Sequence, residues 1–280
     1  HITKSCSELR IETWKALDIP GQFISEKVLE GIDSSDFLIA DITVLNFNVT
    51  YEIGYAIGRG KRVLLTKNKS IQEGTPAIRE VGIFDTLGYR EYQNSNELSD
   101  FIKYANNLSS LNIKSKINIK SPVYLLEGLH KTDWATRIVS RIKKARYAYR
   151  SFDPNEQPRL SASDAINQVS QSHGVVIPLL SISAVGSDVH NMRGAFIAGL
   201  ANGMNKAVCI IQHEDNPVPL DYRDFVCVSH HPKDIDDFIA DFASRIAEAF
   251  QQDSNIISTK DDTLLQSIDL GATSAENEMK

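Results

Sequence analysis

A cluster of polar residues between positions 41 and 52 has the residue types and the spacing of a site for glycosidic chemistry. Its members are Asp41, Thr43, Asn46, Asn48, Tyr51 and Glu52. The first two are expected at the end of a strand, the next two in a loop, and the last two at the start of a helix. Because ligands bind outside the carboxyl ends of parallel strands, all six side chains can line one crevice.

The two carboxylates of this cluster are the candidates for catalysis. Glu52 or Asp41 can attack the anomeric carbon of a sugar, or stabilise the oxocarbenium-like centre that forms as the sugar loses its base. An asparagine can hold ribose hydroxyls, and a tyrosine ring can stack on a base. The candidates for contacts to the substrate are Thr43, Asn46, Asn48, Tyr51 and Tyr55.

Each of these residues also has a structural interpretation. Glu52 can act as a partner of the helix dipole and Asp41 as a cap at the strand end. Asn46 and Asn48 can shape the loop without touching a ligand.

The elements around the cluster occur twice in the chain, in the same order. Aligning Lys61 with Lys206 also aligns a strand before and a strand after the helix, and it matches the small residues of the helix. The matched pairs are Gly54 with Gly199, Ala56 with Ala201 and Gly58 with Gly203. The small residues are best explained by close packing of the helix on its sheet. Glu52 falls on Ile197 and Asp41 on Pro178, so the second copy lacks both carboxylates.

The second copy predicts an α/β fold with a parallel sheet covered on both faces, in a flavodoxin-like doubly wound unit. The expected strands are Val123–Leu126, Tyr147–Phe152, Val175–Leu180, Ala207–Ile211 and Phe225–Ser229. The expected helices are Asp133–Ala145, Ser163–Ser172, Arg193–Gly203 and Ile235–Phe250. The chain is therefore predicted to hold two tandem units of this kind, the second degenerate at the site.

The first copy enters the same pattern late. Leu9–Trp14 aligns with the second strand, and we expect the first strand and helix to lie upstream of His1 or to be missing. The later elements are expected at Ile24–Ile32, Phe37–Asp41, Val49–Gly58, Arg62–Thr66, Ile83–Tyr89 and Glu97–Leu108. The predicted domains are 1–110 and 121–250, joined by a linker at 111–120. Residues 251–280 form either a frayed terminus or a junction to a further domain after Lys280.

Composition narrows the classes of function. At 280 residues and 42% hydrophobic content, the chain can bury the cores of two domains. A net charge of −6 argues against a dedicated nucleic-acid surface, and the basic run Arg137–Arg146 is best explained as a solvated helix face. Three cysteines favour a reducing cytoplasm, and neither a signal peptide nor a stretch long enough to span a membrane is found.

Two other motifs carry little chemistry. The run Gly54–Lys61 is similar to a phosphate-binding loop, but it lacks the required spacing and joins a helix to a strand instead of the reverse. His190, His230 and His231 have no further ligands at metal-binding spacing. We therefore expect neither a metal nor a cofactor.

The motif Ala40-Asp-Ile-Thr, followed by Asn-x-Asn-Val-x-Tyr-Glu-Ile-Gly-Tyr-Ala and Gly-x-Gly-Lys, resembles the nucleoside 2-deoxyribosyltransferase-like superfamily. That superfamily includes nucleotide N-glycosidases and is distantly similar to TIR-type NAD-cleaving domains. The resemblance covers Ser35–Leu65 and implies that Glu52 is the nucleophile. The family's Asp six residues earlier corresponds to Asn46, a departure that disfavours deoxyribosyl transfer but leaves glycosidic cleavage, with Asn48 or Asp41 in support.

The resemblance implies an N-glycosidase or glycosyl-transfer domain that acts on a nucleoside, a nucleotide or an NAD-like molecule. Bacterial proteins of this kind often act as effectors in defence or stress responses, which implies a role in nucleotide depletion. Two alternatives stay open: a non-catalytic sensor of a nucleotide signal, and a purely structural assembly module. Beyond the small molecule, the partner expected is a second copy in a homo-oligomer or a further domain after Lys280.

Overall fold

The computed structural model describes residues 2–13, 24–72, 74, 77–113, 116–213 and 220–252, and contains two parallel sheets. The smaller sheet has the order β1 (Phe37–Asp41), β2 (Arg62–Asn68), β3 (Tyr89–Tyr92). The larger sheet has the order β5 (Tyr149–Phe152), β4 (Val123–Leu126), β6 (Gly174–Leu179), β7 (Ala207–His213), β8 (Val226–Ser229). We call the elements around these sheets the first unit and the second unit.

Helices separate the strands of both units. Those of the first unit are α1 (Ile2–Ser5), α2 (Ile24–Ser34), α3 (Phe47–Gly58), α4 (Ile78–Val81), α5 (Ile83–Thr86) and α6 (Ser95–Tyr104), followed by the 3-10 turn η2 (Ala105–Asn107). Those of the second unit are α7 (Asp133–Lys144), α8 (Ala162–Ser170), α9 (Ser187–Gly203), the 3-10 helix η3 (Leu220–Phe225) and a helix over residues 232–252.

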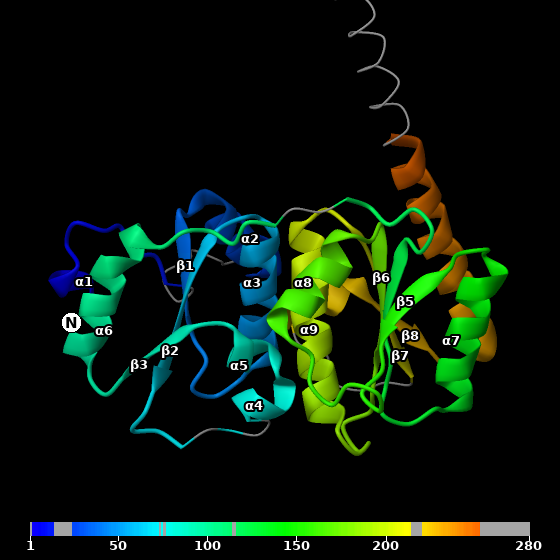
Figure 1. Cartoon of the computed structure of the whole chain (residues 1–280), viewed down its shortest axis with the longest axis horizontal. Coiled ribbons are helices and arrows are strands. Elements are labelled where there is room, and N and C mark those ends of the chain that lie inside the picture. The colour runs from blue at the N-terminus through cyan, green and yellow to red at the C-terminus, as the bar shows by residue number, and fades with distance from the viewer. Residues whose placement is uncertain are drawn as a thin grey trace, which may run out of the picture.

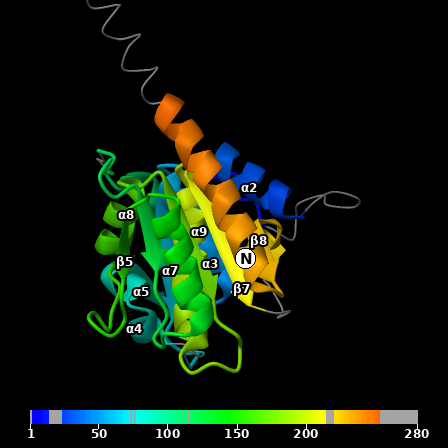
Figure 2. The same cartoon turned by 90° about the vertical axis from the view of Figure 1, so that its right-hand side faces the viewer.

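The second unit has the complete flavodoxin-like strand order, so the predicted fold class is confirmed. Helix α7 and the helix over residues 232–252 cover the outer face of its sheet, and α8 and α9 cover the inner face (Figures 1 and 2). Because helices cover both faces, β4 and β6 are buried along their whole length, as their uninterrupted apolar sequences predict.

The described strands of the first unit correspond to the last three strands of the second. Phe37 pairs with Arg62 across β1 and β2, and Gly174 pairs with Ala207 across β6 and β7. The same number of residues separates Arg62 from Ala207 as separates Gly54 from Gly199. Equivalent strands therefore have equivalent pairing, and Asp41 stands where the second unit has Pro178.

The predicted strand Ile83–Tyr89 is wrong. Residues 83–86 form the short helix α5, and the strand β3 begins only at Tyr89. Gly82 has φ +86°, which turns the chain before α5, and Phe84 is fully buried with its ring edge-on to Phe196 of the second unit. The apolar run that predicted a strand instead fills the contact between the two units.

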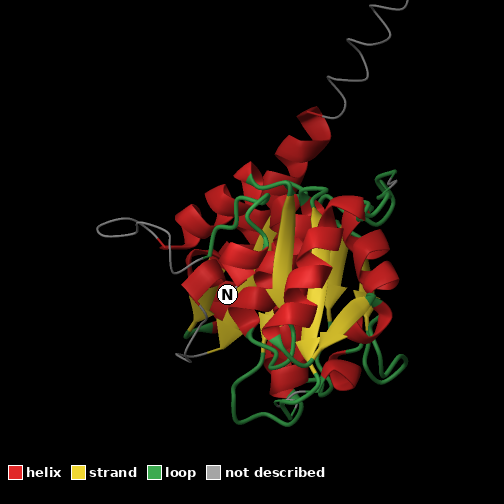
Figure 3. Cartoon of the chain, turned by 90° about the vertical axis from the view of Figure 1, so that its left-hand side faces the viewer, coloured by secondary structure: helices red, strands yellow, loops and turns green. Residues whose placement is uncertain are grey.

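The strand expected at Leu9–Trp14 is absent from residues 9–13. Leu9 and Ile11 instead pack with Leu64 and Ile102 on the outer face of the smaller sheet, beside α1 and α6 (Figure 3). Trp14, the other end of that expected strand, lies outside the described residues, as do 253–280 of the predicted tail.

The two units meet face to face through α3 and α9, which lie between the two sheets (Figure 1). A Cβ atom on Gly54 would lie 2.9 Å from the backbone N of Leu200, and one on Gly199 would lie 3.0 Å from the backbone N of Tyr55. Leu200 is the equivalent of Tyr55, so the contact is reciprocal, as in a two-fold symmetric interface. Gly54, Gly58, Gly199 and Gly203 thus serve contact between the units, which corrects the expectation of helix-on-sheet packing.

Candidate functional site

The carboxyl edge of the smaller sheet joins Asp41 and Thr43 to two residues that the sequence did not single out. Asp41 accepts hydrogen bonds from the backbone N–H of Thr43 (2.8 Å) and from the hydroxyl of Tyr92. Thr43 is buried, and its hydroxyl oxygen accepts from the backbone N–H of Asn68 (2.7 Å). Both oxygens of Asp41 are therefore engaged in holding the loop, which favours its interpretation as a cap at the strand end.

Tyr92 and Asn68 end β3 and β2, at the same edge as Asp41 at the end of β1. Burial, followed by the hydrogen bond to Asp41, raises the pKa of Tyr92 to about 12. The phenol is therefore protonated at neutral pH and can donate to the carboxylate. Correct ends for β2 and β3 would have identified both residues from the sequence, because the carboxyl ends of parallel strands lie at one edge.

Asn46 and Asn48 take different positions around the start of α3. The side chain of Asn46 caps the helix by accepting from the backbone N–H groups of Asn48 (2.8 Å) and Val49 (3.3 Å). This cap explains why α3 begins at Phe47 instead of Val49. The side-chain oxygen of Asn48 is buried and has no hydrogen-bond partner within the part of the chain that the structure describes.

Glu52 is half-buried in the second turn of α3, one turn beyond Asn48. Its equivalent in α9, Ile197, is fully buried in the core. Glu52 therefore lies deeper in the helix than the expected position at its start, where a carboxylate would interact most strongly with the helix dipole.

The two tyrosines expected to stack on a base are placed elsewhere. Tyr51 is fully buried, its ring lies 5.6 Å from that of Tyr222, and its hydroxyl oxygen accepts from Asn202 (2.7 Å). It belongs to the contact between the units. Neither ring face of Tyr51 is open to a ligand at the carboxyl edge in this conformation.

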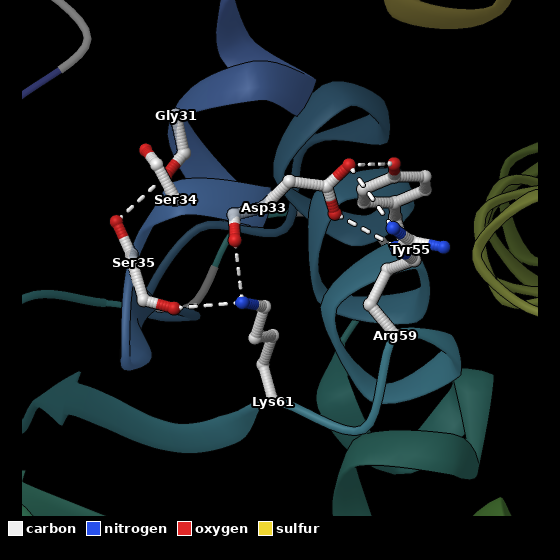
Figure 4. Close-up of polar contacts among 7 residues, drawn as sticks. All are labelled: Gly31, Asp33, Ser34, Ser35, Tyr55, Arg59 and Lys61. Carbon is white, nitrogen blue, oxygen red and sulfur yellow. Dashed lines mark hydrogen bonds and ion pairs between the residues drawn. The ribbon is translucent and has the colours of Figure 1, made fainter.

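Tyr55 points toward the C-terminal end of α2 (Figure 4). Its hydroxyl donates to Asp33 (3.0 Å), which also pairs with Arg59 (2.8 Å), while Lys61 donates to the backbone oxygens of Asp33 and Ser35 (2.6 and 2.9 Å). Burial, followed by the bond to Asp33, raises the pKa of Tyr55. Lys61 thus holds the carbonyl end of α2, which gives the repeated lysine a structural role.

A cavity of about 450 Å³ lies at the carboxyl edge of the larger sheet. The loops after β4, β5 and β6 line it, and α4 of the first unit forms part of its wall. The lining residues are Arg79, Glu80, Leu129, Pro154, Pro158, Arg159, Gly186, Val189, His190 and Arg193. In the order β5-β4-β6-β7-β8 the chain leaves β4 and β6 in opposite directions, so this cavity occupies the position at which doubly wound sheets bind ligands.

Arg193 is the most buried charged residue of the cavity wall, at 5% exposure. It donates to the backbone oxygens of Glu80 (2.8 Å), Val81 (2.9 Å) and Pro158 (2.9 Å), and its guanidinium lies 5.1 Å from the centre of the Phe152 ring. Burial lowers the pKa of Arg193 to about 10. No described carboxylate forms an ion pair with it.

His190 and Asn191 hold the loop that precedes α9. The Nε2 atom of His190 lies 2.6 Å from the backbone oxygen of Pro178, and burial lowers the pKa of this histidine to about 4. The Asn191 amide accepts from the backbone N–H of Leu180 (2.9 Å) and donates to its oxygen (2.8 Å). Helix α9 begins at Ser187, six residues before the predicted start at Arg193.

The basic run Arg137–Arg146 forms ion pairs within the second unit. Arg137 and Arg141 of the basic run both pair with Asp236 (2.8 and 2.5 Å), which ties α7 to the helix over residues 232–252. The described residues contain no group of three or more His, Cys, Asp or Glu side chains arranged to hold a metal ion. No helix within the described ranges is long and apolar enough to cross a membrane.

The comparisons with known proteins leave the family open. No protein-family model matches the chain, and no curated protein matches its sequence.

Proposed function

We propose that this chain binds a small anionic ligand of the nucleotide type in the cavity of the second unit, and that it acts as a sensor of that ligand without turning it over. The observation that carries this proposal is Arg193, a buried guanidinium in the cavity wall with no described carboxylate to balance it. A buried charge that lacks a counter-ion is costly, and an anionic ligand would supply one.

The other charges of the cavity wall favour the same sign of ligand. Arg79 and Arg159 add two further cations against the single carboxylate of Glu80. Helix α9 begins at the cavity without a side-chain cap, so its first N–H groups and its dipole favour negative charge there.

The rest of the wall suits the uncharged part of such a ligand. Leu129, Pro154, Pro158 and Val189 form an apolar surface beside the arginines. The volume of about 450 Å³ lies in the range of small-molecule sites. A phosphate group next to a flat, weakly polar ring matches this division of the wall.

The lining favours binding over catalysis. His190 is bonded to a backbone oxygen, and its lowered pKa makes it a weak base at neutral pH. Glu80 is exposed, and its carboxylate accepts from the backbone N–H of Ala77 (3.3 Å). The pKa of His190 therefore lies well below the value near neutral pH that general acid–base catalysis requires, and the Glu80 carboxylate is engaged in capping α4.

Isothermal titration of the chain with AMP, adenosine and inorganic phosphate tests the proposal. We expect AMP to bind at least tenfold more tightly than adenosine. Arg79→Ala should weaken AMP binding about tenfold, whereas Arg90→Ala, which removes another exposed arginine, from β3, should leave it unchanged. Equal affinity for AMP and adenosine, or equal loss in the two variants, would contradict an anion site in this cavity.

A second candidate function, glycosidic cleavage in the first unit, is favoured by Glu52. This carboxylate is retained at a half-buried position where the second unit has a fully buried isoleucine, as the resemblance to nucleotide N-glycosidases implies for a nucleophile. Chromatography of nucleotides and NAD incubated with the chain would detect released base. Glu52→Gln should abolish the release and Glu26→Gln, at an exposed position of α2, should not. Release that survives in Glu52→Gln eliminates this candidate.

A further inference from the structure

The cavity lies beside a junction at which the two units touch, formed by residues 78–86 of the first unit and residues 158–162 of the second. Gly82 packs against Leu160: a Cβ atom on this glycine would lie 2.9 Å from the backbone oxygen of Leu160. Helix α4, at one end of this junction, also contributes Arg79 and Glu80 to the cavity wall. A ligand in the cavity therefore contacts both units.

Most hydrogen bonds of the junction involve a backbone group, and a ligand could not readily replace either partner. Arg193 donates to the backbone oxygens of Glu80, Val81 and Pro158, and thus bridges the two units. The backbone N–H of Ala162, at the start of α8, donates to the hydroxyl oxygen of Thr86 in α5 (2.8 Å). Because these groups are at least partly buried, breaking their hydrogen bonds would leave polar atoms without partners.

One contact of the junction differs from these. Arg159 pairs with Asp85 of α5 at 3.2 Å, and the two side chains are 62% and 30% exposed. Arg159 also lines the cavity, and one of its five donors makes the only hydrogen bond of its side chain to a described residue. An exposed ion pair of this kind is weak and can be replaced by a better partner.

We propose that Arg159 exchanges partners when the cavity is occupied. In the ligand-free chain its guanidinium holds Asp85 of the first unit, and in the liganded chain it turns to the phosphate of the nucleotide. This inference rests on the function proposed above and specifies it: the ligand carries a phosphate group, and its binding releases a contact between the units. Arg159 binds the phosphate group, and Asp85 competes with the phosphate for the guanidinium of Arg159.

The exchange predicts a particular pattern of affinities, measured with AMP by isothermal titration. Asp85→Asn removes the competitor, so AMP should bind about two- to fivefold more tightly, while the weak binding of adenosine should not change. Arg159→Ala should weaken AMP binding. In an Arg159→Ala background, Asp85→Asn should have no further effect, because the competitor has lost the side chain for which it competes.

Glu80→Gln is the matched control, since it also removes one carboxylate charge, in this case from the cavity wall itself and from a residue without a bond to Arg159. Any gain in affinity that it causes should persist in the Arg159→Ala background. If Asp85→Asn tightens AMP binding equally with and without Arg159, the effect is general electrostatics and the exchange is overturned. If Asp85→Asn leaves the AMP affinity of an otherwise wild-type chain unchanged, the exchange alone is also overturned. If the wild-type chain binds no AMP, the proposed function fails, and the exchange with it.

Discussion

The carboxyl edges of the two sheets are built from equivalent strands, yet they carry opposite charge. The edge of the first unit holds Asp41, with Glu52 in the helix behind it, whereas the second unit has Pro178 and Ile197 at these positions and Arg193 in its cavity wall. The glycines that the two copies share hold the units together. The residues that differ are therefore the better guide to ligand binding.

The equivalent asparagines show how one position has taken two roles. Asn46 caps α3, whereas Asn191 lies inside α9 and fixes the backbone of Leu180. Helix α9 consequently begins earlier, with its first turn at the wall of the cavity. The carboxyl edge of the second unit therefore differs from that of the first in having a longer loop and a longer helix.

The largest loss of stability should come from disrupting the reciprocal contact between α3 and α9. Gly199→Leu places a side chain against the backbone of Tyr51 and Tyr55, and backbone on both sides leaves no room to relax. We expect a loss of about 3 kcal/mol or more in the free energy of unfolding. Thermal denaturation measures it, with Gly88→Ala as control, because a Cβ atom at Gly88 has no neighbour within 4 Å. Equal melting temperatures for the two variants would refute the close packing.

Removal of Arg193 should affect both stability and binding. Arg193→Met leaves three backbone oxygens without their charged donor, and we expect a loss of roughly 3 kcal/mol of stability together with the loss of AMP binding. Urea denaturation and titration check the two effects. Arg137→Met, on the outer face, should retain binding. A variant at position 193 that is folded and binds AMP normally is incompatible with the proposed counter-ion role.

His190 should make the second unit sensitive to acid. Its pKa is lowered from 6.5 to about 4 in the folded chain, so the unfolded chain binds more protons between these values. The stability contributed by the neutral imidazole is therefore complete above pH 6.5 and is lost as the pH falls toward 4, by roughly 3 kcal/mol in total. Denaturation at several pH values should show a flatter profile for His190→Gln than for His130→Gln, an exposed histidine. Identical profiles would argue against a buried neutral imidazole.

The smallest effect is expected at the edge of the first unit. Tyr92→Phe removes the hydroxyl that donates to Asp41 while keeping the ring. We expect a loss of about 1 kcal/mol in stability and no change in AMP affinity, because the bond lies outside the cavity. A large loss of AMP binding in this variant would move the ligand site to the first unit.

The sequence predicted most of the local structure but little of the contact between the units. Periodicity and the repeat locate β1, β4 and the longer helices of both units, because these elements bury continuous apolar faces, whereas the short helices α1, α4 and α5 were not predicted. The run at residues 83–89 was misassigned as a strand because Ile83 and Phe84 are apolar for contact with the other unit and not for burial in a sheet. The positions of Tyr51 and Tyr55 also depend on contacts between residues that are far apart in the sequence. Tyr51 packs against Tyr222 of the second unit, and Tyr55 bonds to Asp33 of α2.

The candidate site was harder to predict than the fold. The cavity combines three loops of the second unit with α4 of the first, and no local motif encodes that combination. His190, Asn191 and Arg193 stood out in sequence only as residues near a loop. Their roles follow from hydrogen bonds to backbone atoms, such as the oxygen of Pro178, and these atoms come close only in the folded chain.

Photo-crosslinking with an azido derivative of AMP, followed by mass spectrometry of the digested chain, tests most directly which edge binds the ligand. We expect crosslinks in the loops after β4 and β5, within residues 127–132 and 153–161, and their loss in the presence of excess AMP. Crosslinks confined to residues 42–52 would instead place the ligand in the first unit and refute binding in the cavity of the second.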